Sequence, residues 1–341
     1  MSFTSKFDAI DAKLSAMNAK LLKDEDFIEL AHKDNLQEIL NYLKDKDYYK
    51  ELNSFDSIYE AEEKLNLSRI SKIKKLIHYL SGPYKDFAKA LLREFEIRDL
   101  KKIIRTIYLN EDIKDLKNRL LILEPGDLSE LKGGSLESFV NSLNDSLYYK
   151  TLNPYKDIKE DVVLFYMEMN LDRLFYSELY NISKDFSKRD RENFSLIYGQ
   201  RIDLLNIRWI YRGLKYYDLY REELINFSML GGYYYNYDDL RELCYKETTE
   251  DFINEVKKSP YGFLFEGDKV DIYMDRRAGR YLYYLAKSNF TKKEGFIKFM
   301  TFVFLLEYEV KDIEAIMESI RFNLTFAQTL QYLFRSYKEV K

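Results

Sequence analysis

The sequence predicts an all-α protein, and three observations carry that prediction. Only 4 prolines and 12 glycines interrupt 341 residues, which favours long helices with short connections over a sandwich or a barrel. Apolar residues recur at helical spacing, for example at Ile70, Ile73 and Ile77. A ten-residue segment occurs three times, at 96–105, 203–212 and 309–318, which indicates a tandem of related helical units.

We call this segment the decad and number its positions 1 to 10. Position 1 is acidic, position 4 is Asp or Asn, and positions 5 and 8 are apolar. The residues at these four positions, copy by copy, are Glu96, Asp99, Leu100 and Ile103; Asp203, Asn206, Ile207 and Ile210; and Glu309, Asp312, Ile313 and Ile316. The period of just over a hundred residues predicts three units, at 1–118, 119–222 and 223–341.

Each unit has the same expected order of elements. An acidic, apolar lead-in comes first, and a short amphipathic helix follows, capped by the side chain of Asn35, Ser135 or Thr249. A turn rich in tyrosine comes next, at Tyr48 and Tyr49, at Tyr148 and Tyr149, and at Tyr261. Longer helices then lead to the decad.

The longer helices are predicted from apolar stripes. In the first unit the stripe from Ile70 reaches Leu80 and ends at Gly82-Pro83, and a second stripe continues through Phe87 into the decad. The stripe of the second unit runs through residues 163–175, and that of the third through 272–285. Residues 263–272 hint at a strand, although a loop between helices explains them as well.

The composition limits the classes of protein to which this chain can belong. The formal net charge of −4 argues against a general nucleic-acid binder, and a single cysteine, Cys244, excludes an intrachain disulfide framework. We expect no secretion signal at residues 1–11. We also expect no transmembrane segment, because the longest strongly apolar run covers only residues 302–306. The 31 tyrosines and 23 phenylalanines supply a packed core and partly hydrated rims.

No motif indicates catalysis, a cofactor or a metal. Gly133-Gly134-Ser135 lacks the lysine and the upstream glycine of a phosphate-binding loop and fits a helix cap better. His32 and His78 stand far apart and have no metal-ligand spacing around them. Carboxylates alternate with lysines at helical spacing, as solvated helix faces do. An acid–base pair of carboxylates is neither indicated nor excluded.

Charge is distributed unevenly along the chain. Residues 69–105 hold eleven Lys and Arg against four acids, whereas acids predominate over 233–255. Arg208 and Arg212 share one face of the second decad, with Arg201 on about the same side. These three arginines are the candidate partner-binding residues. An ordinary basic helix face and a docking surface for an acidic partner are both consistent with them.

The three units, with their tyrosine turns and decads, resemble the C subunit of archaeal-type V/A ATPases, called the d subunit in eukaryotic V-ATPases. The resemblance covers nearly the whole chain. It implies three similar helical subdomains with pseudo-threefold symmetry that form a funnel. It also implies a cytoplasmic location, peripheral at the inner face of the membrane.

The function that the resemblance implies is that of a non-catalytic central-rotor subunit of a rotary ATPase. Such a subunit links the central stalk (D-type and F-type subunits) to the membrane rotor ring of c-type or K-type proteolipids. It transmits torque for ATP-coupled proton or sodium transport and needs no cofactor. The third decad departs from the first two, because Glu314 and Glu318 stand where the others have Lys101 and Arg105 or Arg208 and Arg212.

Two other functions compete with this one. A general all-α repeat scaffold for other cytosolic proteins is the first, although the common helical arrays repeat every ~34 to ~40 residues. An enzyme of unknown type is the second, and a deep pocket with strongly perturbed carboxylates would support it.

Overall fold

The described part of the chain is entirely helical, which confirms the predicted all-α class. The computed structural model describes residues 7–46, 49–50, 52, 54–55, 57–111, 116, 120–123, 135–158, 162–217 and 219–337, and these contain helices and turns but no strand. The stretch at 263–272 is a 3₁₀ helix, η6 (Gly262–Phe265), followed by a turn and the first residues of a long helix.

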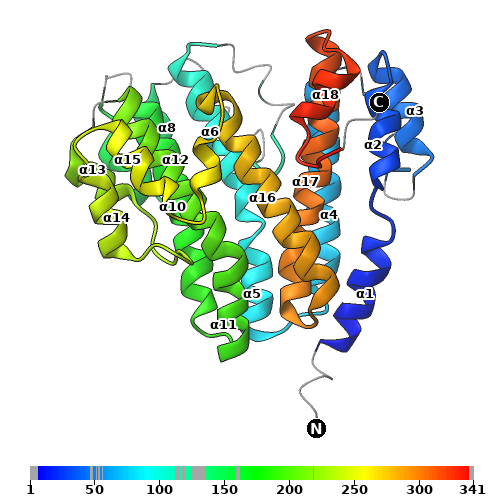
Figure 1. Cartoon of the computed structure of the whole chain (residues 1–341), viewed down its shortest axis with the longest axis horizontal. Coiled ribbons are helices and arrows are strands. Elements are labelled where there is room, and N and C mark those ends of the chain that lie inside the picture. Colours follow the sequence, from blue (N-terminus) through cyan, green and yellow to red (C-terminus); the bar gives the residue numbers. More distant parts are fainter. Residues whose placement is uncertain are drawn as a thin grey trace.

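Short helices form the outer parts of the molecule (Figure 1). Those of the N-terminal third are α1 (Asp8–Asn18), α2 (Asp24–Ala31) and α3 (Leu36–Lys44). Those of the middle third are α8 (Leu136–Ser142), α9 (Tyr149–Leu152) and η4 (Asn153–Tyr155). Those of the C-terminal third are α13 (Arg221–Phe227), α14 (Tyr237–Cys244), α15 (Thr249–Lys257), η6 and α18 (Phe326–Tyr332).

Longer helices run side by side through the body of the molecule. Three of them carry the predicted apolar stripes: α4 (Ile58–Ile77), α10 (Val163–Ser183) and α16 (Val270–Lys292). The decads lie in α6 (Arg93–Tyr108), α12 (Gln200–Tyr216) and α17 (Phe296–Arg321). Helix α5 (Gly82–Ala90) precedes α6, and α11 (Lys188–Phe194) joins α12 through a π-helical turn, η5 (Ser195–Gly199).

The expected helix caps are present at two of three positions. The Asn35 side chain accepts a hydrogen bond from the Glu38 amide, and the Ser135 hydroxyl accepts one from Ser138. In the third case the prediction was wrong by one residue: Thr248 caps α15, and Thr249 is its first helical residue. Thr248 forms a reciprocal cap with Asp251, which favours this start over the next position.

The apolar positions of the decads are buried in all three copies, as expected from their spacing. Positions 5 and 8 are exposed by at most 2% (Leu100, Ile103, Ile207, Ile210, Ile313 and Ile316). Helix α17 is buried on nearly every side from Phe296 to Val310, which is typical of a helix at the centre of a large core. Deep burial of this kind fixes where each decad helix lies and how it is rotated.

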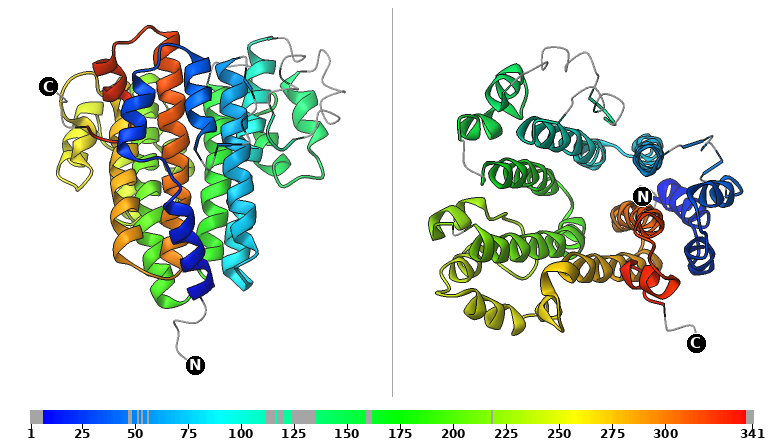
Figure 2. Two further views of the ribbon diagram at one scale, coloured as in Figure 1. Left: turned by 90° about the vertical axis from the view of Figure 1, so that its right-hand side faces the viewer. Right: turned by 90° about the horizontal axis from the view of Figure 1, so that it is seen from above.

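The two ends of the described chain lie against each other. Helix α17 packs on α1, α2 and α4, and α18 packs on α2. Seen from above, the blue N-terminal helices stand beside the orange α17 and the red α18 (Figure 2). A separate buried cluster mixes residues from both ends, including Phe27, Leu30 and Leu43 with Ile313 and Met317. The fold therefore closes on itself.

Candidate functional site

The acid at position 1 of every decad accepts a hydrogen bond from the hydroxyl of a turn tyrosine. Tyr148 donates to Glu96, and Tyr261 donates to Asp203 at 2.8 Å. Each of these tyrosines follows its acid, by 52 and 58 residues. The acid of the third decad, Glu309, instead bonds to a tyrosine near the start of the chain. A tyrosine of the next segment thus holds each of the first two decads, and a tyrosine of the first segment holds the third.

Two of these acids, Asp203 and Glu309, also accept from backbone amides. Asp203 accepts from the N–H groups of three consecutive residues, Tyr233, Tyr234 and Tyr235, at 2.7 to 3.3 Å. Gly232 allows this wrap, because a Cβ there would overlap with Asp203 Oδ1. Burial raises the pKa of Asp203 to about 6, and the four hydrogen bonds only partly oppose that rise.

Position 4 binds the chain that returns after the decad helix. Asp99 accepts from the amides of residues 121–123, Asn206 exchanges two hydrogen bonds with the backbone of Met229, and Asp312 accepts from the Phe334 amide and the Arg335 guanidinium. The bonded amides begin 22, 23 and 22 residues after the acceptor. This near-equal spacing shows that the three copies use position 4 in the same way.

Position 6 reaches a long helix in each copy. Lys101 Nζ lies 2.5 Å from Asp172 on α10, and Arg208 lies 3.0 Å from Asp275 on α16. In the third copy the polarity changes, because Glu314 accepts from the side-chain amide of Asn66 on α4 at 3.0 Å. Positions 1 and 6 therefore make their contacts in the same order. Each of the first two decads contacts the segment that follows it, and the third decad contacts the first segment.

The three decad helices share a cavity of about 520 Å³, which we call the decad cavity. Equivalent positions line it, because positions 3 and 6 of every decad face it. Its lining residues are Asn66, Arg69, Glu94, Phe95, Ile97, Arg98, Lys101, Lys102, Arg105, Asp172, Phe175, Tyr176, Arg201, Leu205, Arg208, Val310, Lys311 and Glu314.

Arginine and lysine dominate this lining, with eight such side chains against three carboxylates among the described residues. Most of the acids that neutralise them stand outside the lining. Arg98 pairs with Glu62 at 3.7 Å, Arg105 with Glu168, and Arg208 with Asp275. The cations therefore face the cavity while most of their partners lie behind them.

The most buried ion pair of the cavity joins Arg201 to Glu307. The guanidinium makes two hydrogen bonds to the carboxylate, at 2.5 and 2.9 Å, and Glu307 is 1% exposed. Burial alone would raise the pKa of Glu307, but Arg201 and Lys311 hold that pKa well below its usual range. The guanidinium also stacks 5.0 Å from the ring centre of Phe304, so its position is fixed on two sides.

Phe304 also belongs to an aromatic cluster. Tyr198 packs edge-on against Phe304, and Phe87 packs against Tyr198, Phe194 and Phe296. These rings come from α5, α11, η5 and α17. Contacts from Arg201 to Phe304 and from Phe304 to Tyr198 therefore connect the decad cavity to this packed aromatic core.

The third decad brings one carboxylate into the lining, Glu314, alongside the cations Arg69 of α4 and Lys311 of α17. Burial raises the pKa of Glu62, and repulsion from Glu314 raises it further. Burial also raises the pKa of Glu314. Glu318, one turn beyond Glu314, adds to the pKa rise of Glu62, so α4 and α17 together carry a group of three carboxylates.

The three predicted site residues occupy different settings. Arg201 and Arg208 line the decad cavity, whereas Arg212 lies outside that lining and pairs with Asp275 at 3.3 Å. Their role in partner binding stays a prediction. The prediction used only the charges near the second decad, so it did not include Arg98, Lys101 and Lys102 of α6, which line the same cavity. The excess of basic residues over 69–105 was the signal that could have found them.

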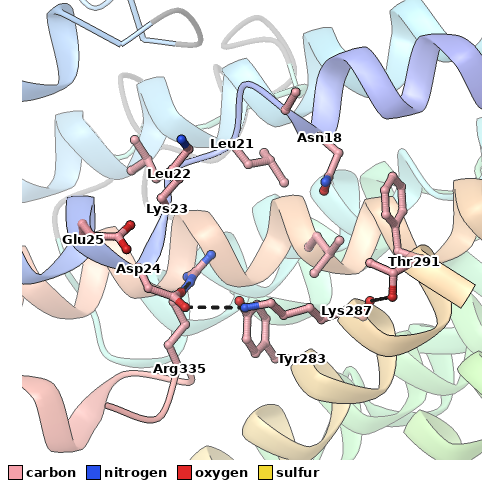
Figure 3. A pocket seen from close by; sticks show the side chains of 13 residues that line it. Asn18, Leu21, Leu22, Lys23, Asp24, Glu25, Tyr283, Lys287, Thr291 and Arg335 are labelled. Carbon is pink, nitrogen blue, oxygen red and sulfur yellow. Dashed lines mark hydrogen bonds and ion pairs between the residues drawn. The ribbon is translucent and has the colours of Figure 1, made fainter. Parts of the chain in front are cut away.

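A second cavity, of about 470 Å³, lies where the chain closes on itself (Figure 3). Residues 18–25 form one side, and Tyr283, Lys287 and Arg335 form the other. Asp24 bridges the two sides, 3.6 Å from Lys287 and 3.5 Å from Arg335. These pairs, in which Arg335 is buried and Asp24 and Lys287 are exposed, hold the first segment to α16 and to the residues after α18.

The sequence predicts no metal site. Within the described ranges, no group of three or more His, Cys, Asp or Glu side chains is placed to hold a metal ion. His32 stacks on the Phe326 ring with centroids 3.9 Å apart, and Cys244 is buried. Packing accounts for the positions of both residues.

The family model of the ATP synthase (C/AC39) subunit matches residues 10–332. The chain belongs to this family. Similar proteins carry the name of the C subunit of A-type ATP synthase. The one from Methanosphaera stadtmanae is 25% identical over 331 residues, covering 91% of this chain and 83% of the relative. That from Methanococcoides burtonii is 23% identical, covering 76% and 72%, and that from Thermococcus kodakarensis is 24% identical, covering 74% and 68%.

The family assignment confirms the resemblance inferred from the decads and tyrosine turns. Among the described helices of this ATP synthase (C/AC39) family member, none combines the length and the apolar character that crossing a bilayer requires.

Proposed function

We propose that this protein is a non-catalytic subunit of the central rotor of a rotary ATPase. It would act as a socket that links the central stalk to the membrane rotor ring and passes torque between them. The observation that carries the proposal is the closed order of contacts around the decad cavity. Each decad binds the segment that follows it, and the last decad binds the first segment.

The proposal includes the threefold organisation of the chain. Units 1–118, 119–222 and 223–341 would be related by a pseudo-threefold axis and would together form a funnel around the decad cavity. Three features support this arrangement: the repeated tyrosine contact at position 1, the amide contact at position 4 and the long-helix contact at position 6. An object of that symmetry suits a place on a rotation axis.

Torque transfer requires a part that does not deform as it turns. Closed packing contributes to that stiffness, because every decad helix is held by buried apolar residues and by charged or polar contacts at positions 1, 4 and 6. An open array of helices would leave its two terminal units unsupported on one side. Here the pairs between Asp24, Lys287 and Arg335 support the place where such an array would be open.

The partners follow from this role. The relatives are named as the C subunit of A-type ATP synthase, which supports membership of such a complex. Central-stalk subunits of the D and F types would enter the funnel. The cytoplasmic loops of the c-type or K-type proteolipid ring would meet its narrow end, at the inner face of the membrane. The complex would couple ATP to proton or sodium transport.

Binding of the full chain to purified stalk subunits tests the proposal. We expect a stable complex in size-exclusion chromatography with the D-type and F-type subunits from the same organism. We also expect the chain to co-purify with the proteolipid ring from native membranes. A chain that bound neither the stalk nor the ring would overturn the assignment.

A further inference from the structure

The three decads are alike in packing but not in charge. Position 6 is Lys101, Arg208 or Glu314, and all three side chains face the decad cavity. Position 10 changes in the same way, since Glu318 replaces the arginines of the first two copies. The change in charge therefore falls on the residues that line the shared cavity and the turn next to it. The buried positions 5 and 8 keep their apolar character.

Position 6 of the third decad is paired differently from position 6 of the other two. Lys101 and Arg208 each have a carboxylate partner within 3.0 Å, whereas the hydrogen-bond partner of Glu314 is the neutral amide of Asn66. Glu62 stands close enough to Glu314 for the two carboxylates to repel each other. The charges of Arg69, Arg98 and Lys311 oppose the rise in the pKa of Glu314. An entering lysine or arginine would give the Glu314 carboxylate an ion pair of its own.

Two arginines of the lining, Arg69 on α4 and Arg208 on α12, retain unused donors. The Nε atoms of Arg69 and Arg208 are buried, and neither has a hydrogen-bond partner among the residues that the structure describes. Arg69 itself is 4% exposed, and its other nitrogens bond to Asn66 and Glu94. Buried donors of this kind are costly unless a partner satisfies them. A carboxylate entering from the cavity supplies such a partner.

We propose that the decad cavity sets a single rotational register for the protein tip that enters it. The tip presents acidic side chains to the basic residues of α6 and α12 and a lysine or arginine to Glu314 of α17. This inference rests on the proposed role as a socket and adds the chemistry of the partner. It also assigns a function to the residues in which the third decad departs from the other two.

A socket with three identical walls would accept a partner in three orientations 120° apart with equal free energy. A rotor joint needs one of them, because slippage between registers would lose torque. A hundredfold preference for one register corresponds to about 2.8 kcal/mol of difference in binding free energy. Forming one cation–carboxylate pair and avoiding one like-charge pair together give a preference of that order when water is largely excluded.

The test compares the wild-type chain with E314K/E318K, which gives the third decad the charges of the other two. Each is mixed with the purified D-type and F-type stalk subunits of the same ATPase, and the register is read from particle classes in electron cryo-microscopy. We expect one register in the wild type and at least two populated registers in the variant. E242K/E247K, which changes two exposed acids on and after α14, is the matched control and should keep one register.

E314Q serves as a second variant in case the double substitution perturbs folding. It retains an acceptor for Asn66 and removes only the charge, so we expect the minor registers to rise at least tenfold without loss of helix content. Three registers in the wild type, or one register in every variant, would overturn the inference while leaving the socket in place. A wild-type chain that did not bind the stalk would overturn the socket itself.

Discussion

The Tyr49 hydroxyl donates a hydrogen bond of 2.6 Å to Oε1 of Glu309, across 260 residues of sequence. Both side chains are fully buried, and the Leu22 amide donates to the other oxygen of the same carboxylate at 2.7 Å. Two residues of the first segment thus complete the environment of an acid in the last long helix. This contact is the counterpart of Tyr148 with Glu96 and of Tyr261 with Asp203, and it closes the set of three.

We expect Tyr49→Phe to lower the free energy of unfolding by about 1–3 kcal/mol, because it leaves a buried carboxylate short of one donor. Urea denaturation followed by circular dichroism measures this. The matched control is Tyr245→Phe, whose hydroxyl bonds to Glu222 on the surface, and its effect on the unfolding free energy should be much smaller. Equal effects of the two variants would contradict a structural role for the Tyr49 contact.

Arg201→Met should be strongly destabilising, by about 3–5 kcal/mol, because it removes the bidentate partner of a buried carboxylate. The double variant Arg201→Met with Glu307→Gln should recover part of this loss, since no uncompensated buried charge then remains; Lys311, which also pairs with Glu307, is 42% exposed. Denaturation of both single variants and the double variant gives the coupling free energy. A coupling near zero would show that Arg201 and Glu307 do not act as a pair.

Asp203 gives a predicted pH dependence. Its pKa is about 6 in the fold against 3.8 as the ordinary value, so the folded chain holds this proton more tightly than the unfolded chain does. The stabilisation is complete below the unfolded pKa and is lost as pH rises through about 6. The difference in unfolding free energy between wild type and Asp203→Asn should therefore fall by about 1–2 kcal/mol from pH 5 to pH 7.5. A difference independent of pH would contradict the raised pKa.

The single cysteine should be unreactive in the folded protein. Cys244 is fully buried, and burial raises the pKa of its thiol to about 12, so little thiolate forms near neutral pH. We expect a thiol reagent at pH 8 to modify Cys244 at least a hundredfold more slowly in buffer than in 6 M guanidinium chloride. Fast modification of the native protein would show that α14 opens readily.

Much of the fold followed from local patterns in the sequence. The long helices, the apolar positions of the decads and two of the three expected caps are where spacing and cap chemistry placed them. Patterns of this kind depend on residues close in sequence, which is why they are readable without coordinates. The third cap was misplaced because Thr248 and Thr249 are adjacent and chemically the same.

The contacts of the decad cavity depend on distant residues and were not predicted. The repeat showed that positions 1 and 4 are polar in every copy, and it showed a tyrosine turn in every unit. It did not show that the acid at position 1 bonds to a turn tyrosine, because 52 to 260 residues separate the two partners. For the same reason the arginines of α12 were identified by charge, while their partners Glu307 and Asp275 were not.

The buried cluster shared by the two chain ends has a consequence for synthesis on the ribosome. Phe27, Leu30 and Leu43 are synthesised at least 270 residues before the Ile313 and Met317 that cover them. A nascent chain would expose this apolar surface until Ile313 and Met317 are made, and aggregation competes with folding during that period. Helices α2 and α3 should therefore depend on chaperones that shield the growing chain, more than the middle segment does.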